Sequence, residues 1–498
     1  MPRADGAGAS PTMSRREALR SAALCAAGLA LGRASAAGPR SAVSAGAGAN
    51  GAGPLPCSVS IPGDRSHAPF RTSWNGCWTG DPRMVAHVRD AGDVSAALRF
   101  ARREGFPVVV RSGGHSFAGA SVGDGLVIDV SPMRAIATGS KPGIVDAGGG
   151  VRVGELEYGL FRRLGGRTVT LGSCASVGVS GLLLGGGFSA MSRVHGLTID
   201  ALDEVEAVLA DGTVVVATEG TNADLFWALR GGGAGFAVVT RMSFRTRTWS
   251  QAHAVTQHWR WDDGARVLER WSRWIESLPA GASSSLIWMT SGAAANSDVR
   301  TIVRSERGEV AAGRIADALS DAVGRKPKRS KQWCTDAPSA RREAPTSGPR
   351  TANGSMFGES SVSGTTAELI AERFRLRVDA RGGGGEGTAM LLCNAFGGAV
   401  ARIEPGATAF PHRRARFLAE VATEWPAGRT DLDVSNRAWV RATVDGARAG
   451  FGGGSYVNYA DPGMQGWREA YWGANLARLQ AIRRGVDPMG VLAGKLSA

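Results

Sequence analysis

Short β-branched and aliphatic runs recur through the first half of the chain. Runs of this length, bounded by glycine or polar residues, are typical of buried strands rather than helices. They cover residues 108–110, 126–130, 144–147, 205–209, 214–216 and 236–240. Asp211 and Gly212 separate two of the runs, and an Asp-Gly pair in that position predicts a β-hairpin.

Helical spacing appears between these runs. Asp93 is the expected cap of a helix that ends near Gly105. Its apolar face consists of Val94, Ala97, Leu98 and Ala101. A second helical pattern over 153–164 stops at two glycines, and 225–229 is typical of a short buried helix. Strands and helices in this order predict an α+β protein.

The pattern changes near residue 247 and stays different to about residue 443. Tryptophans gather at its start, and we expect core packing for them in preference to the lining of a sugar- or polyketide-binding groove. They are Trp259, Trp261, Trp271 and Trp274. A polar, basic, proline-containing stretch over 325–354 predicts a long surface excursion, and 467–484 predicts one amphipathic helix. The region from residue 247 to about residue 443 should form a separate α+β domain.

The N-terminus has the features of an export signal. Arg15 and Arg16 precede a short apolar stretch, and Ala34-Ser35-Ala36 follows as a cleavage site. The sequence therefore predicts a twin-arginine signal over 1–36 and secretion of the mature protein, with a flexible linker over 37–56. An arginine-containing N-terminal helix is the alternative.

Composition narrows the possible partners. The net charge of +14 is scattered and lacks interleaved aromatics or a recognisable module, which argues against nucleic acid. No apolar run reaches the roughly 18–20 residues of a membrane span. The chain has no Cys-x-x-Cys pair and no metal-ligand spacing among its seven histidines, so we expect no metal. Cys57 and Cys77 could pair as a disulfide.

The first strand leads directly into a stretch with chemical potential. Arg111, Ser112, Gly113, Gly114, His115 and Ser116 follow it. A glycine pair lets backbone approach a phosphate-bearing ligand, with a cation and hydroxyls nearby. By itself this stretch is more typical of a tight structural turn. Further glycine clusters follow other strand-like runs and suggest loops that face a ligand.

Several motifs together resemble the berberine bridge enzyme-type FAD-linked oxidases of the vanillyl-alcohol oxidase and p-cresol methylhydroxylase superfamily. The motifs are 111–116, 172–178, 184–187, 224–233, 410–413, 456–459 and 487–488. The resemblance implies a two-part FAD-binding domain, 57–246 and 446–498, with an inserted substrate domain over 247–445 that carries an antiparallel sheet. It also implies cofactor contacts from Arg111, Ser112, Gly113, Gly114, Ser116, Gly172, Val177, Gly178, Gly181, Gly185, Gly186, Gly187 and Asn458.

The same resemblance assigns two covalent anchors. It implies that His115 is joined to the flavin 8α-methyl carbon and Cys174 to C6, and both side chains are nucleophiles when deprotonated. The chain departs from the family pattern at Ala175, where proline is usual, and at Ser189 and Ala237, where glycine is usual. The change beside Cys174 makes the cysteinyl bond the less secure of the two.

On the substrate side, the resemblance points to Tyr456 as the base, with Tyr459, Asn394 and Glu420 as further candidates. The expected reaction is hydride transfer from a carbinol carbon to FAD, with dioxygen as acceptor and hydrogen peroxide as product. A hydroxyl or hemiacetal of a complex natural product or its sugar is the favoured substrate, and free oligosaccharides are the alternative. A flavin-retaining protein without turnover, or a basic binding protein, is the alternative of a different class. Nothing in the sequence indicates the oligomeric state.

Overall fold

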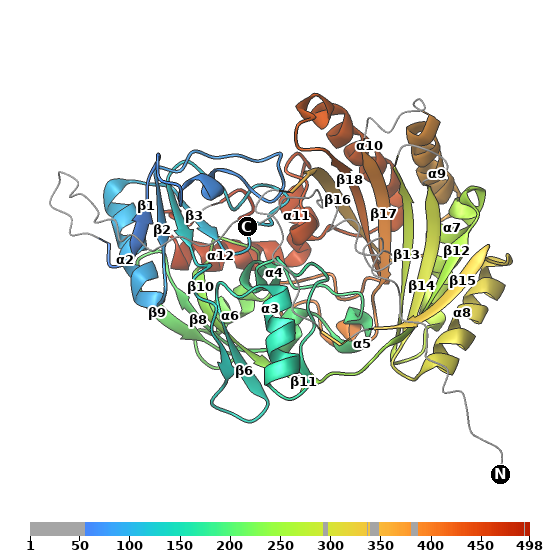
Figure 1. The fold of residues 1–498 in the computed structure, drawn as a ribbon, viewed down its shortest axis with the longest axis horizontal. Helices are drawn as coiled ribbons and strands as arrows, with labels where there is room; N and C mark the ends of the chain where they lie inside the picture. The colour runs from blue at the N-terminus through green and yellow to red at the C-terminus, as the bar shows by residue number, and fades with distance from the viewer. Residues whose placement is uncertain (1–54, 292–296, 336, 339–347, 380–386, 493) are drawn as a thin grey trace, which may run out of the picture.

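The computed structural model describes residues 55–291, 297–335, 337–338, 348–379, 387–492 and 494–498. The signal expected over 1–36 and nearly all of the linker lie outside these residues. Figure 1 shows two β-rich parts side by side, with the C-terminal segment returning to the first.

The first part contains two main sheets. A four-stranded sheet has the order β1-β2-β4-β3, in which β4 is parallel to β2 and to β3. Its strands are β1 (Ser58–Ser60), β2 (Met84–His87), β3 (Val108–Arg111) and β4 (Leu126–Asp129). A five-stranded antiparallel sheet has the order β5-β6-β10-β8-β9. Its strands are β5 (Ile136–Thr138), β6 (Ile144–Gly148), β8 (Leu202–Val208), β9 (Val214–Ala217) and β10 (Val238–Arg245).

Helices connect and cover these sheets. They are α2 (Ala91–Glu104), α3 (Val153–Tyr158), α4 (Val179–Leu184), α5 (Ser192–His195) and α6 (Ala223–Leu229), and a short pair, β7 (Arg167–Thr168) and β11 (Arg247–Thr248), closes this part. The expected hairpin is present, because β8 pairs with β9 around Gly212, whose φ is +90°. The expected helix α6 is also present, and all five of residues 225–229 are buried.

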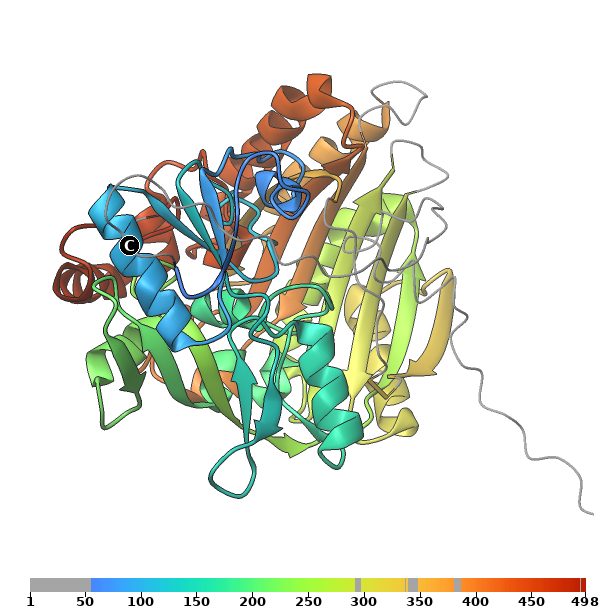
Figure 2. The ribbon, with the colours of Figure 1, turned by 60° about the vertical axis from the view of Figure 1, so that its left-hand side comes forward.

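The second part is built on one seven-stranded antiparallel sheet with the order β15-β12-β14-β13-β17-β18-β16. Its strands are β12 (His253–Trp259), β13 (Ala282–Thr290), β14 (Asp298–Ser305), β15 (Arg329–Cys334), β16 (Arg350–Gly358), β17 (Thr388–Ala395) and β18 (Phe417–Trp425). Figure 2 shows these strands as one layer beside the first part.

Helices cover the sheet on the side away from the first part (Figure 1). They are α7 (Gly264–Trp274), α8 (Glu309–Val323), α9 (Gly364–Asp379) and α10 (Asp433–Phe451). The core between helices and sheet contains Trp259, Trp271 and Trp274, each less than 10% exposed, and Trp261 packs against its edge. The prediction of core packing for the tryptophans is therefore confirmed, and the α+β fold class is as expected.

The residue predicted to cap the start of α2 was wrong. Asp90, not Asp93, is the cap, because its carboxylate accepts a hydrogen bond from the Asp93 backbone N–H at 2.9 Å. The Asp93 carboxylate in turn accepts from the Arg89 backbone N–H at 2.9 Å. Two acidic residues three positions apart can each act as a cap, and the pattern of apolar residues did not distinguish them. The helix ends where expected, at Gly105 in the left-handed region.

The surface excursion predicted for 325–354 was wrong at the start of β16, whereas β15 is an edge strand whose residues are exposed or half-buried. Strand β16 is almost entirely buried, and two of its polar side chains have hydrogen-bond partners in other segments. Asn353 donates to the Glu420 carboxylate at 2.6 Å, and the Ser355 hydroxyl accepts from the Tyr456 backbone N–H at 2.9 Å. Satisfied polar groups can be buried at little cost, and composition alone does not reveal that.

Two further expectations changed. The single C-terminal helix is two helices, α11 (Trp467–Trp472) and α12 (Leu476–Val486), because Gly473 ends the first with a φ of +46°. Cys57 and Cys77 are both free thiols, so the disulfide considered for them is not formed. Cys57 packs in the core under α2, and the Cys77 thiol lies 3.6 Å from the Thr351 carbonyl oxygen.

Candidate functional site

A cavity of about 1970 Å³ lies where the first part, the seven-stranded sheet and the C-terminal segment meet. Ligand pockets typically measure about 300–1,000 Å³, so this one has room for a large cofactor and a substrate together. The glycine-rich turn after β3 and the loop that precedes α4 form one wall. Strands β13, β14 and β17 form another.

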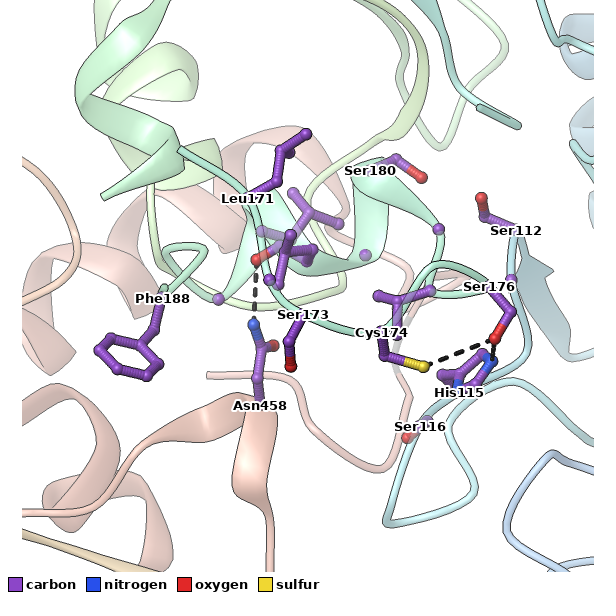
Figure 3. Close-up of a pocket in the computed structure, with 18 of the residues that line it drawn as sticks. Ser112, His115, Ser116, Leu171, Ser173, Cys174, Ser176, Ser180, Phe188 and Asn458 are labelled. Atoms are coloured by element: carbon purple, nitrogen blue, oxygen red, sulfur yellow. Dashed lines mark hydrogen bonds between the residues drawn. The ribbon is translucent and has the colours of Figure 1, made fainter. Parts of the chain in front are cut away.

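His115 and Cys174 meet at the cavity wall. Figure 3 shows both side chains directed toward Ser176, whose hydroxyl lies 2.9 Å from His115 Nε2 and 3.5 Å from Cys174 Sγ. The two residues are far apart in sequence, and the loops that carry them are brought together by folding. A shared hydroxyl therefore places two nucleophilic side chains next to each other on one surface.

The surroundings of His115 keep its imidazole neutral. Burial lowers the pKa of His115 to about 3, and the positive charges of Arg152 and Arg111 add to this effect. The ring stacks on Trp74, with 4.8 Å between ring centroids. A neutral, oriented imidazole retains the lone pair that a nucleophile needs at neutral pH.

Two glycines allow the His115 and Cys174 loops to touch. A Cβ on Gly113 would lie 2.3 Å from the Gly178 nitrogen, and a Cβ on Gly178 would lie 2.3 Å from Ser112 Oγ. Gly181 differs, because nothing lies within 4 Å of its missing Cβ although it lines the cavity. Some glycines here serve loop packing, whereas Gly181 leaves space for a ligand.

Tyr456 is almost fully buried, and three N–H donors lie within hydrogen-bonding distance of its hydroxyl oxygen. The donors are the backbone N–H groups of Gly187 and Phe188, at 3.1 and 3.2 Å, and Asn458 Nδ2 at 3.0 Å. These donors favour the phenolate, but burial outweighs them and raises the pKa of Tyr456 to about 12. Tyr456 is therefore a phenol at neutral pH.

Tyr459 occupies a different position. Residues 457–459 form a 3-10 turn, and both tyrosine rings contact the cavity. The Tyr459 ring is half-buried and packs edge-on against Tyr456, at 5.1 Å, and Phe117, at 6.2 Å. Of the two phenols, that of Tyr459 is the more accessible from the cavity.

The structure brings most of the predicted site residues to the cavity. Those that line it are Ser112, Gly113, Gly114, His115, Ser116, Gly172, Cys174, Val177, Gly178, Gly181, Gly185, Asn394, Tyr456, Asn458 and Tyr459. Figure 3 shows several of them together.

Four predicted residues are not among those that line the cavity. Arg111 donates to the Thr72 carbonyl at 2.7 Å and lies over the Phe70 ring. Gly186 and Gly187 form the turn behind Tyr456, at φ values of +121° and +77°. Glu420 is buried in β18 against Asn353. These residues support the site from behind its surface.

Sequence reasoning missed two residues that contact His115. Ser176 stands two positions after Cys174, and its spacing could have drawn attention. Trp74 comes from a segment without periodicity, and nothing in its local sequence indicates that it stacks on His115.

Family models match both ends of the chain. A model described as FAD binding domain matches residues 82–218, and one described as berberine and berberine like matches residues 455–497. The chain is a berberine bridge enzyme-like FAD-linked oxidoreductase. The two matched segments carry His115, Cys174, Tyr456 and Tyr459, the residues that meet at the cavity.

Curated relatives of this FAD-linked oxidoreductase extend over most of its length. An uncharacterized FAD-linked oxidoreductase of Bacillus subtilis is 28% identical over 86% of this chain and 93% of that protein. Xylooligosaccharide oxidase of Thermothelomyces thermophilus is 29% identical over 82% of this chain and 85% of that protein.

Solved structures share the fold. Glucooligosaccharide oxidase from Acremonium strictum, in a study of its 6-S-cysteinyl, 8α-N1-histidyl FAD, has a TM-score of 0.79 at 23% identity and covers 89% of this chain and 96% of its own. GilR, an oxidoreductase of the terminal step of gilvocarcin biosynthesis, in complex with pregilvocarcin, has a TM-score of 0.78 at 23% identity and covers 88% and 99%.

Two other kinds of feature are absent from the described residues. No helix in this portion of the oxidoreductase is long and apolar enough to cross a membrane. Likewise, the described residues contain no cluster of three or more side chains suited to a metal ion.

Glu420 should make stability fall with rising pH. Burial raises the pKa of Glu420 to about 7 from an ordinary value of 4.5, so its contribution is fully present below about pH 4.5 and is lost as pH rises through about 7. Glu420→Gln stays neutral and can still accept from Asn353. We expect the wild-type melting temperature to fall more between pH 5 and pH 8 than that of the variant, by roughly a few degrees. Differential scanning fluorimetry across this range checks it.

Burial also raises the pKa of Glu424 to about 7. Because Glu424 is present in both the wild type and Glu420→Gln, the difference between their melting temperatures across this pH range reports on Glu420 alone. Parallel curves for the two proteins would contradict the assignment.

Proposed function

We propose that this oxidoreductase is an oxidase that holds FAD through two covalent bonds, from His115 to the 8α-methyl carbon and from Cys174 to C6. In this proposal it oxidises an alcohol or hemiacetal carbon of a complex natural product, or of its attached sugar, to the carbonyl, and dioxygen is reduced to hydrogen peroxide. Export through the N-terminal twin-arginine signal is part of the proposal. The observation that carries it is the convergence of both nucleophiles on Ser176 at the wall of one large cavity.

The residues at this wall fit the cofactor. His115 is neutral, Gly181 leaves open space, and the bicovalent linkage named for glucooligosaccharide oxidase uses the same two residue types. Ala175 stands where the family has proline, yet its carbonyl accepts from the Gly154 N–H at 2.9 Å. The Val177 carbonyl accepts from the Val153 N–H, also at 2.9 Å. The start of α3 therefore holds the cysteine loop without a proline.

When bound, FAD supplies the acceptor for two electrons from the substrate and passes them to dioxygen. The protein must remove the hydroxyl proton and position the reacting carbon. The sequence favoured Tyr456 as the base, but the structure changes our preference. Because Tyr456 is buried whereas Tyr459 is half-buried at the cavity, Tyr459 is better placed to accept a proton from a substrate there. Tyr456 then acts as a positioning residue.

The sheet side of the cavity supports the proposed substrate class. Ile287, Ile302 and Leu392 line this side, with Trp333 at its edge. An oligosaccharide would bury many hydroxyl groups, each of which needs a hydrogen-bond partner. The apolar lining favours a largely apolar natural product, whereas several relatives are named as oligosaccharide oxidases, which keeps that class as the second candidate.

The covalent attachment can be tested on denatured protein. Acid-precipitated wild-type protein should remain yellow, and His115→Ala and Cys174→Ala should each retain flavin through the remaining bond. The double variant should release its flavin into the supernatant. Flavin absorbance in pellet and supernatant, with mass spectrometry of flavin-bearing peptides, measures this. A colourless wild-type pellet would contradict the tethering, and the protein would then be at most a binder of free flavin.

The two tyrosines should differ when each loses its hydroxyl. Tyr459→Phe should slow substrate reduction of the flavin by about 10²-fold or more, as expected for loss of a positioned base, with little change in melting temperature. Tyr456→Phe leaves three N–H donors without their acceptor, so it should lower stability by about 1–3 kcal/mol and slow the reaction less. Stopped-flow flavin bleaching and thermal unfolding separate these effects. Slow reduction confined to Tyr456→Phe, at unchanged stability, would return the base assignment to Tyr456.

A substrate panel distinguishes the two enzyme classes. We expect hydroxylated aromatic lactols and glycosides to bleach the flavin roughly tenfold or more faster than xylo-, cello- and chito-oligosaccharides at equal concentration. Flavin absorbance without oxygen, and peroxide formation with oxygen, report the two half-reactions. Rapid peroxide formation with an oligosaccharide would establish the second class, and absence of bleaching with every compound would favour a flavin-retaining protein without turnover.

A further inference from the structure

The cavity-facing side of the seven-stranded sheet carries one charged side chain among apolar and neutral polar ones. Alternate residues of three strands line the cavity: Ser285 and Ile287 of β13, Ile302 and Arg304 of β14, and Leu392 and Asn394 of β17. Among the described residues, Arg304 is the only charged residue that the strands of this sheet contribute to the cavity lining. A lone cation on an apolar wall is costly unless it meets a countercharge.

Arg304 is held in place by neutral partners. Its Nη1 donates to Ser285 Oγ at 2.9 Å, and the Ser285 hydroxyl donates to Asn394 Oδ1 at 2.8 Å. These two consecutive hydrogen bonds fix the guanidinium and orient the Asn394 amide on the same face of the sheet. Since Ser285 accepts only one hydrogen bond from Arg304, most of the five N–H donors of the guanidinium are left for another group.

No carboxylate in the described part of the chain forms an ion pair with Arg304. The carboxylate of Glu306, two residues further on, has other partners. Its Oε1 lies 2.7 Å from His195 Nε2 and accepts a hydrogen bond from the Ser250 hydroxyl at 2.5 Å. Burial lowers the pKa of Arg304 to about 10, so the side chain is still a cation at neutral pH. The fold thus keeps an uncompensated positive charge at the wall where a substrate would lie.

We propose that Arg304, positioned by Ser285 and Asn394, binds an anionic oxygen group of the substrate. This inference rests on the proposed function, because it takes the cavity to be the substrate site. The ligand chemistry is a carboxylate, or an ionised phenol or enol, on an otherwise apolar aromatic framework. A guanidinium binds such oxygens through two parallel N–H donors, and the isoleucine and leucine side chains contact the framework.

Binding of small probes to the flavin-loaded protein tests this without turnover. The probes are 2-naphthoate for the carboxylate, 4-nitro-1-naphtholate for the ionised phenol, and 2-naphthamide as the neutral analogue, each measured by isothermal titration calorimetry at neutral pH. We expect at least one anion to bind about tenfold or more tightly than the amide. Arg304→Met should abolish this preference, and Arg304→Lys should keep part of it.

Arg273→Met is the matched control, because Arg273 lies exposed on α7 and pairs with Glu269 outside the cavity. It should keep the full preference for the anion. Equal binding of anions and amide to the wild type, no binding of either anion, or a preference that survives in Arg304→Met would overturn the proposal. Peroxide formation, measured on the same flavin-loaded samples, reports failure of the proposed oxidase function separately, since calorimetry measures binding without turnover.

Discussion

Tyr456 holds three parts of the chain in register through its hydroxyl oxygen and its backbone N–H. It accepts from Gly187 and Phe188 of the first part, and Asn458 of the C-terminal segment adds the third donor. The backbone N–H of the same tyrosine donates to Ser355 in the seven-stranded sheet. Because a buried donor without its acceptor is costly, the 3-10 turn over 457–459 has little freedom, and this constraint sets where the Tyr459 ring meets the cavity.

A second contact organises the opposite wall. Gly113 and Gly178 let two loops approach more closely than any side chain would allow, and Ser176 then reaches both His115 and Cys174. The loops come from segments separated by a sheet and a helix, so their contact depends on the whole first part being folded. Backbone hydrogen bonds from the start of α3 reinforce it. The cofactor side of the cavity is therefore rigid for reasons of backbone geometry.

Local patterns predicted the elements well and their environments less well. Strand-like runs, the Asp-Gly hairpin and the glycine after α2 follow from short-range preferences, and the structure contains them. Burial of β16 was missed because Asn353 and Ser355 are satisfied by partners more than 60 residues away. The roles of Trp74 and Arg304 depend likewise on contacts between distant segments. The resemblance to a family brought His115, Cys174 and the tyrosines together, but it could not say which phenol is buried.

The electrostatic surroundings of Tyr456 and of Arg304 on the sheet face are opposite in sign. At Tyr456, several N–H donors converge on one neutral oxygen, which favours negative charge there, and burial prevents it. At Arg304, a permanent positive charge meets only the neutral Ser285 hydroxyl, and no protein carboxylate of the described residues balances it. A substrate in the cavity would meet the Tyr459 phenol and the Arg304 guanidinium, because both line it. An acidic aromatic compound with an oxidisable hydroxyl satisfies both, whereas a neutral sugar would leave the guanidinium uncompensated against an apolar wall.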